Sequence, residues 1–125
     1  LAANSLLVYV DSEPGSATGL TFWFEPTWHL VGPTGVLLGS RQAQVEDPDA
    51  RSKLSDLTAN LFEKKVEELS VVPLTHDLHV FFEGSYSIKT FVSDPVDNES
   101  WHIRDNKTKH RLVGCAAGLR VTEAG

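Results

Sequence analysis

Two tryptophan–histidine pairs, Trp28-His29 and Trp101-His102, are the residues whose types and spacing best suit a binding site. Indole rings bind apolar groups, and imidazole binds metals or transfers protons near neutral pH. If the two halves of the chain are related by a pseudo-twofold axis, His29 and His102 would meet in a cleft that both tryptophans line. Neighbouring residues on a strand face opposite sides, however, so a buried tryptophan leaves its histidine on the other face. The favoured interpretation therefore has both tryptophans in the core and both histidines on the surface.

The remaining chemistry-bearing residues give no complete catalytic or metal site. His76 and His79 are three positions apart where a turn enters a strand, so they face opposite sides and do not suit one metal ion. Cys115 has His102 and His110 nearby in sequence as bases, but small residues at strand ends usually serve packing. No phosphate-binding loop, nucleophile elbow or paired-cysteine spacing occurs. We therefore predict no catalytic residue, no metal and no cofactor, which favours a non-enzymatic protein.

Charged residues are segregated along the chain. The formal net charge is −6, yet the stretch 102–120 is basic. A chain with net negative charge lacks the extended basic face that phosphate backbones require, so nucleic acid is not an expected partner. Acidic loops instead predict a protein partner with a basic surface. The residues expected to bind that partner are Asp11, Glu13, Asp94, Asp97 and Glu99.

Hydrophobic alternation and turn residues predict a chain made mostly of short β-strands. Clusters of Gly, Pro, Asp and Asn separate runs that are rich in β-branched and aromatic residues. The first four runs predict an antiparallel meander over the first forty residues. Pro73 confines the run 66–74 to a sheet edge, where a second copy of the chain can pair to form a homo-oligomer. The predicted strands are 5–10, 19–25, 27–31, 36–40, 66–74, 78–82, 86–92, 101–103, 111–114 and 118–121.

One amphipathic helix is predicted between the two β regions, over about 48–65. Asp47-Pro48-Asp49 supplies an N-cap, a proline at the first helical position and a carboxylate in the first turn. Apolar residues then recur at helical spacing, and two lysines follow where the helix dipole favours cations. These residues are Leu54, Leu57, Leu61 and Phe62, followed by Lys64 and Lys65.

The two β regions resemble each other in order and in detail. Leu6–Val10 parallels Leu78–Phe82, each Trp-His pair precedes an aliphatic residue, and Leu37–Ser40 parallels Leu112–Cys115. One four-stranded meander has an apolar face with nothing to bury it against, whereas two copies share a core. We therefore predict one α+β domain, mainly antiparallel sheet, in which two similar β-meander halves are joined by the amphipathic helix. The halves span 1–45 and 75–122.

Length and composition fit a globular chain. Its 125 residues, 41% of them hydrophobic, suit one domain with a buried core and exclude intrinsic disorder as the main state. No apolar run reaches the roughly 18 residues of a membrane-spanning helix, so a membrane is not an expected partner. The single cysteine, Cys115, has no internal disulfide partner and favours a reducing, cytoplasmic compartment.

Residues 75–105 resemble small bacterial domains of unknown function, some of which lie in toxin–immunity gene neighbourhoods. The resemblance rests on the strand Asp77–Phe82, the hairpin Gly84–Phe91 and a Trp-His-Ile strand after an acidic loop. It implies an α+β single domain with a binding role. We therefore expect a non-enzymatic protein-binding domain, such as an immunity-type protein whose acidic loops occupy the basic site of a toxin. The alternative is a small-molecule-binding protein or an enzyme with a cleft between the two β halves.

Overall fold

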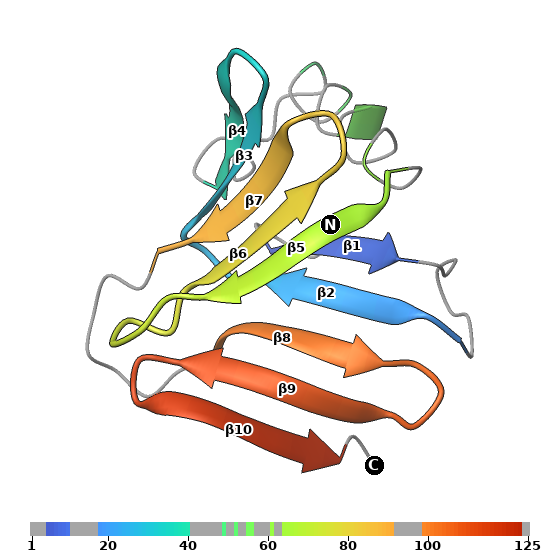
Figure 1. Cartoon of the computed structure of the whole chain (residues 1–125), viewed down its shortest axis with the longest axis vertical. Coiled ribbons are helices and arrows are strands. Elements are labelled where there is room, and N and C mark those ends of the chain that lie inside the picture. The colour runs from blue at the N-terminus through green and yellow to red at the C-terminus, as the bar shows by residue number, and fades with distance from the viewer. Residues whose placement is uncertain are drawn as a thin grey trace.

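The structure is a computed structural model that describes residues 5–10, 18–40, 64–91 and 99–123, together with residues 49, 52, 55, 56 and 61. These described residues form ten β-strands in two five-stranded antiparallel sheets (Figure 1). The elements defined among them are all strands, so the prediction of an α+β fold is wrong and the fold is all-β, although single described residues such as 49, 52 and 61 have helical backbone. Two facing sheets already provide both layers that a core requires.

The predicted helix over 48–65 falls largely outside the described residues. Of its apolar stripe the structure describes Leu61, which is buried in the core. Lys65, expected at the helix end, is instead paired with Glu83 at the end of a strand. Its N–H donates to Oε1 of Glu83 at 3.2 Å, and its carbonyl accepts the Glu83 N–H at 2.9 Å. The end of the expected helix is therefore extended backbone that leads into Val66, the first residue of a strand.

Sheet 1 combines strands from both ends of the described chain. The hairpin between its third and fourth strands is closed by Asp105, whose Oδ1 accepts the N–H of Lys107 at 2.9 Å. Asp105 also accepts the N–H of Lys109 through its carbonyl oxygen, at 2.7 Å. In spatial order the strands are β1 (Leu6–Val10), β2 (Leu20–Phe24), β8 (Glu99–Asp105), β9 (His110–Cys115) and β10 (Gly118–Glu123).

Sheet 2 is built from the middle of the chain. The tight turn at Gly84-Ser85 joins two of its strands, and both residues have positive φ, which glycine adopts without strain at the first position. The strand that begins at Val66 lies at a sheet edge, as the sequence predicts, but it ends at Val71 rather than at residue 74. In spatial order the strands are β4 (Gly35–Gly39), β3 (Trp28–Gly32), β7 (Tyr86–Thr90), β6 (Leu78–Phe82) and β5 (Val66–Val71).

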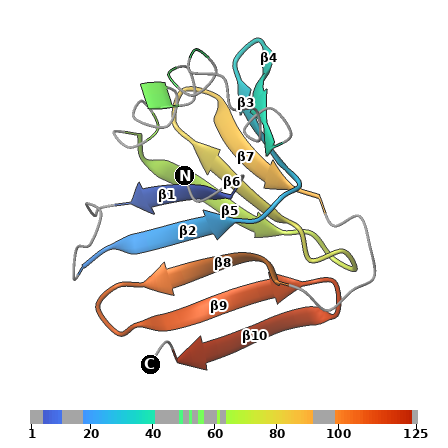
Figure 2. The ribbon, with the colours of Figure 1, turned by 180° about the vertical axis from the view of Figure 1, so that it is seen from behind.

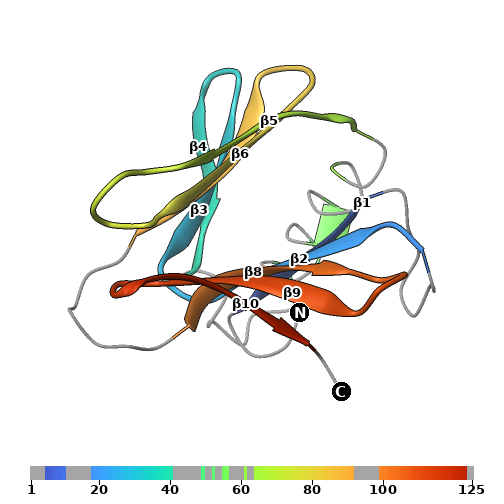
Figure 3. The same cartoon turned by 60° about the horizontal axis from the view of Figure 1, so that its bottom comes forward.

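The chain passes from sheet 1 to sheet 2 where β2 runs on into β3. The N–H of Glu25 donates to Ser100 at 2.9 Å and extends the pairing with β8, whereas the carbonyl of Thr27 accepts the N–H of Phe91 at 2.9 Å beside β7. Pro26 between them has no N–H to donate. The predicted meander over the first forty residues is therefore wrong, because β2 and β3 pair in different sheets. Figure 3 shows the two sheets inclined to each other, with β3 rising from the end of β2.

The two halves of the chain contribute equivalent hairpins to opposite sheets. Sheet 1 has the order β1-β2-β8-β9, and sheet 2 has the order β6-β7-β3-β4. Exchanging β1-β2 with β6-β7, and β8-β9 with β3-β4, converts one order into the other. Two duplicated halves would give this arrangement if each placed one hairpin in each sheet. The internal duplication stays a prediction that agrees with this strand order.

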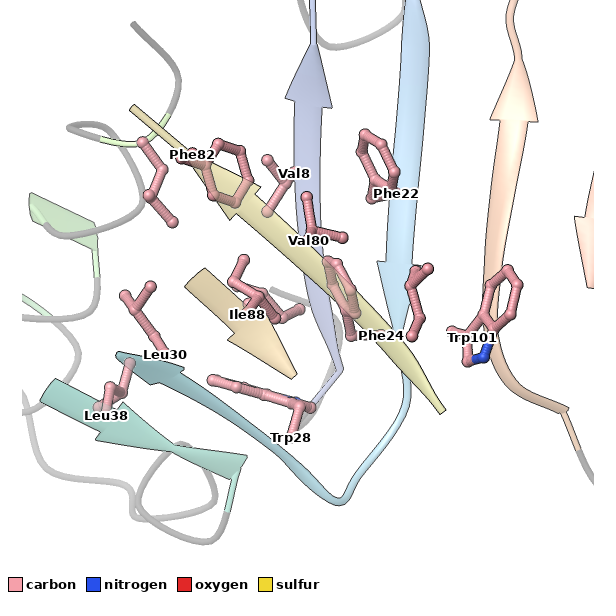
Figure 4. Close-up of a cluster of buried hydrophobic side chains, with 13 residues drawn as sticks. Val8, Phe22, Phe24, Trp28, Leu30, Leu38, Val80, Phe82, Ile88 and Trp101 are labelled. Carbon is pink, nitrogen blue, oxygen red and sulfur yellow. The ribbon is translucent and has the colours of Figure 1, made fainter. Parts of the chain in front are cut away.

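The hydrophobic core lies between the sheets (Figure 4). Alternate residues of the central strands point into it, which accounts for the alternation in the sequence. Trp28 and Trp101 are 1% and 0% exposed, and they belong to the same cluster. The buried cluster consists of Leu6, Val8, Phe22, Phe24, Trp28, Leu30, Leu38, Leu61, Leu78, Val80, Phe82, Ile88 and Trp101.

Trp101 links the two sheets directly. It lies on β8 opposite Gly114 of β9, and a Cβ added to Gly114 would overlap the indole ring. The indole N–H donates a 2.8 Å hydrogen bond to the carbonyl of His76, in the connection between β5 and β6. Nδ1 of His76 in turn lies 3.3 Å from the carbonyl of Ala116, in the turn between β9 and β10. One side chain therefore packs against its own sheet and hydrogen-bonds the other.

We predict that Gly114→Ala destabilises the protein by about 1–3 kcal/mol, because the new methyl group must displace the Trp101 ring. Gly39→Ala is the matched control, since its Cβ would come no closer than 3.9 Å to the carbonyl of Trp28. Urea unfolding followed by near-ultraviolet circular dichroism measures both. An equal midpoint for the two variants would contradict the packing of Trp101 on Gly114.

Candidate functional site

The four residues of the predicted cleft do not line one site. Trp28 and Trp101 are buried in the shared core, whereas their histidine neighbours point the other way. His29 therefore lies on the outer face of sheet 2 and His102 on the outer face of sheet 1. The expectation that both are surface groups is wrong for His102, which is buried under Trp23 and Glu99. The core separates the two histidines, so they cannot act together as a metal or acid/base pair.

His102 belongs to a hydrogen-bonded network at one end of the outer face of sheet 1. Its Nδ1 lies 2.8 Å from Oε2 of Glu99, and its ring stacks on Trp23 with the centroids 5.7 Å apart. The indole N–H of Trp23 donates to Glu25, which also accepts a 2.9 Å hydrogen bond from Oγ of Ser5. Each of these polar side chains has a partner within the protein, which indicates a structural role.

The acidic residues predicted to bind a basic partner are mostly not described. Glu99 is the exception, and its carboxylate is engaged by His102. The other four, Asp11, Glu13, Asp94 and Asp97, lie outside the described residues. A basic partner at the acidic loops therefore stays a prediction.

The remaining predicted candidates have packing roles in the structure. Cys115 is buried, and its thiol donates a 3.3 Å hydrogen bond to the carbonyl of Gly118 across the β9–β10 turn. His76 docks its own loop against sheet 1 through the two contacts given above. Within the described ranges, no group of three or more His, Cys, Asp and Glu side chains is placed to hold a metal ion. Those ranges also contain no helix long and apolar enough to cross a membrane.

A basic row crosses the outer face of sheet 2. Lys89 on β7 lies opposite both His29 on β3 and His79 on β6. Burial lowers the pKa of both histidines below its ordinary value, and the Lys89 charge lowers the pKa of each further. Asp77 acts against this shift by raising the pKa of His79. Both imidazoles are therefore mainly neutral at pH 7, and Lys89 carries the charge of the row.

Two arginines lie directly opposite each other on the outer face of sheet 1. Arg104 on β8 pairs with Arg111 on β9, and the cross-strand partners on either side are threonines. Like charges in directly opposite positions normally destabilise a sheet. We call this set of cross-strand partners the arginine row; from β1 to β10 it consists of Tyr9, Thr21, Arg104, Arg111 and Thr122.

The arginine row contains most of the unsatisfied buried polar atoms of the described structure. The Nε atoms of Arg104 and Arg111 and Oγ1 of Thr122 are buried and have no hydrogen-bond partner. Within the described part of the chain, neither arginine has a carboxylate within ion-pair distance. Buried donors without partners usually cost free energy unless a ligand or water completes them. The row is therefore the strongest candidate binding site of the described structure.

β10 adds an open edge beside the arginine row. Among the described residues no strand pairs with its outer side. Leu119 and Val121 face the core side of sheet 1 but are 48% and 71% exposed. Figures 1 and 2 show that β9 and β10 extend beyond the part of sheet 1 that sheet 2 covers. The edge therefore presents apolar side chains on one face and Arg120, with the arginine row, on the other.

We predict that Lys89→Gln raises the pKa of both His29 and His79 toward the ordinary value, because it removes a nearby positive charge. Lowered histidine pKa values in the folded state make the free energy of unfolding decrease as the pH falls below about 6.5, since the unfolded chain then binds more protons. Lys89→Gln should weaken this decrease. Imidazole NMR titration and urea unfolding against pH measure the two effects, with Lys107→Gln on sheet 1 as the control. Unchanged pKa values of His29 and His79 in Lys89→Gln would contradict the prediction, because the Lys89 charge would then have no effect on either histidine.

The candidate surface of sheet 1 was only partly foreseen from the sequence. The sequence shows the basic stretch 102–120 but not that Arg104 and Arg111 are cross-strand partners. The predicted neighbouring strands 101–103 and 111–114 are the available signal, because the register of a hairpin follows from the turn that joins its strands. Comparisons of this chain with protein-family models, curated proteins and solved structures find no match.

Proposed function

We propose that this chain is a non-enzymatic protein-binding domain that takes up an extended segment of a partner protein beside β10. The observation that carries the proposal is the open β10 edge, which has exposed apolar residues on one face and arginines on the other. Strand addition to a sheet edge uses backbone hydrogen bonds for affinity and alternate side chains for specificity. The β10 edge offers unpaired backbone groups for affinity and different side chains on its two faces for specificity.

The two faces of the edge define the partner segment. Side chains of an added strand alternate between the faces, as those of β10 do. On one face they would contact Leu119 and Val121, which favours apolar residues. On the other face they would lie next to Arg120 and near Arg111, which favours Asp and Glu. The expected segment therefore alternates apolar and acidic residues.

A second copy of the chain fits this edge less well than an acidic partner. In an antiparallel pair of two β10 strands, residues on the same face become neighbours across the new interface. The outer faces of both copies would then bring Arg120 and the arginine rows together. Like charges in such positions are unfavourable. The same reasoning does not apply to the β5 edge, so a homo-oligomer through residues 66–74 stays a prediction.

Three further expectations concern the acidic loops, a cleft between the halves and the cellular compartment. An immunity-type role, with acidic loops in the basic site of a toxin, stays a prediction because four of the five acidic residues are not described. A cleft for a small molecule between the β halves has less support, since Trp28 and Trp101 are buried in the shared core. A reducing, cytoplasmic compartment stays our expectation from the single Cys115.

Binding of a peptide that alternates valine and glutamate tests the proposal. We expect the backbone amides of β10 to gain protection from hydrogen exchange, because the added strand hydrogen-bonds the open edge. Val121→Lys should abolish the protection, since a lysine on the apolar face of an edge blocks pairing. Val36→Lys is the matched control on sheet 2, where Val36 is 63% exposed on the edge strand β4.

Two outcomes would overturn the proposal. The first is that the β10 amides stay unprotected at a peptide concentration that saturates any binding. The second is that a peptide alternating valine and lysine protects β10 as well as the acidic peptide does, because the arginines would then play no part in selection. Protection confined to β5 would instead assign binding to the other edge.

A further inference from the structure

We propose that Arg104 and Arg111 form a binding site for a phosphate dianion on the outer face of sheet 1. This site goes beyond strand addition, because it lies on β8 and β9 and does not require a strand at the β10 edge. Its ligand is either free inorganic phosphate or the phosphoryl group of a phosphorylated side chain. Both sources present the same tetrahedral dianion to the arginines.

The register places the two guanidinium groups within reach of one anion. Arg104 and Arg111 are directly opposite in neighbouring antiparallel strands, where Cβ atoms are roughly 5 Å apart. Each guanidinium is a planar fork with five N–H donors and no acceptor, which suits the oxygens of phosphate. Two forks side by side supply donors to several oxygens of one tetrahedral group. A carboxylate has only two oxygens and one charge, so it would leave part of this pair unmatched.

The polar atoms of the arginine row are incompletely satisfied. The Nε atoms of both arginines and Oγ1 of Thr122 are buried without a hydrogen-bond partner. Thr21, on the other side of Arg104, is different, because its Oγ1 donates to Oδ1 of Asn106 at 3.2 Å. The unmatched atoms therefore gather around the arginine pair and on its β10 side. Two positive charges beside three buried, unpartnered polar atoms suit an anion with several oxygens.

Among the described residues, the carboxylates near the pair are committed to other partners. Asp105 follows Arg104 but holds the hairpin turn through the N–H groups of Lys107 and Thr108. At the far end of the same face, Glu25 accepts hydrogen bonds from Trp23 and Ser5, and Glu99 contacts His102. Neither arginine is fully buried, so an anion from solvent can approach the pair. Within the described structure, the row therefore has a positive charge that no internal group neutralises.

Titration with inorganic phosphate at constant ionic strength tests the site. The Nε–Hε NMR signals of Arg104 and Arg111 should shift together and saturate with one dissociation constant. Arg111→Gln and Arg104→Gln should each weaken phosphate binding on the order of tenfold, as expected from the loss of a charge-assisted hydrogen bond. Arg111→Lys should also weaken binding, because it keeps the charge but loses the fork. Arg120→Gln is the control, since it removes the same charge from an exposed position on the same face.

The outcomes separate this site from simpler explanations and from the proposed function. Non-saturating shifts, or equal weakening by Arg120→Gln and Arg111→Gln, would overturn the site and leave only the general basic charge of the surface. Tighter binding of a phosphoserine peptide than of inorganic phosphate would identify a phosphorylated side chain as the source, and the reverse would identify the free ion. Val121→Lys should abolish strand addition but leave the phosphate shifts intact, so either proposal can fail alone.

Discussion

The packing of Trp101 between the two sheets is the interaction on which the rest of this structure depends. Its ring takes the space above Gly114 in sheet 1, and its indole N–H hydrogen-bonds the carbonyl of His76 in the β5–β6 connection. Because the ring is fully buried, its indole N–H has no access to water. The hydrogen bond to His76 avoids the free-energy cost of leaving this N–H unpaired. The same connection reaches the β9–β10 turn through His76. The sheets are therefore fixed relative to each other near the point where the chain passes between them.

In this arrangement the inner faces of both sheets form one core. Side chains that could bind a partner therefore lie on the outer faces and edges of the sheets. The two tryptophans pack in the core, and their histidine neighbours consequently lie on the outer faces of different sheets, where His102 is nevertheless buried. Sheet 1 extends beyond sheet 2 at β9 and β10, so its last strand keeps an exposed apolar face and an open edge. On the other face of this sheet, Arg104 and Arg111 concentrate positive charge, although the formal net charge of the protein is −6. A binding surface at this end of sheet 1 follows from the fold without any cleft in the core.

The strands could be predicted from the sequence, whereas their partners could not. Alternation of buried residues and turn-forming residues such as Gly84 locate the strands to within a few positions, because both signals are local. The pairing of β2 with β8 and of β3 with β7 joins distant parts of the chain, and no local pattern specifies it. For the same reason the predicted meander fails at Pro26, where the chain changes sheets. The fold class is missed because two sheets already provide both layers of the core, to which the 48–65 region adds Leu61.

The central claim is that this protein binds its partners on the outer face and edge of sheet 1 rather than in a cleft between its halves. The indole N–H signals of the three tryptophans test it most directly, because Trp23 lies on that outer face and the other two lie in the core. On addition of phosphate, we predict that the NMR signal of Trp23 shifts while those of Trp28 and Trp101 stay in place, because Trp23 lies on the same face of β2 as Thr21, the cross-strand neighbour of Arg104. Shifts of Trp28 and Trp101 with an unchanged Trp23 would contradict the account and restore a site between the two halves.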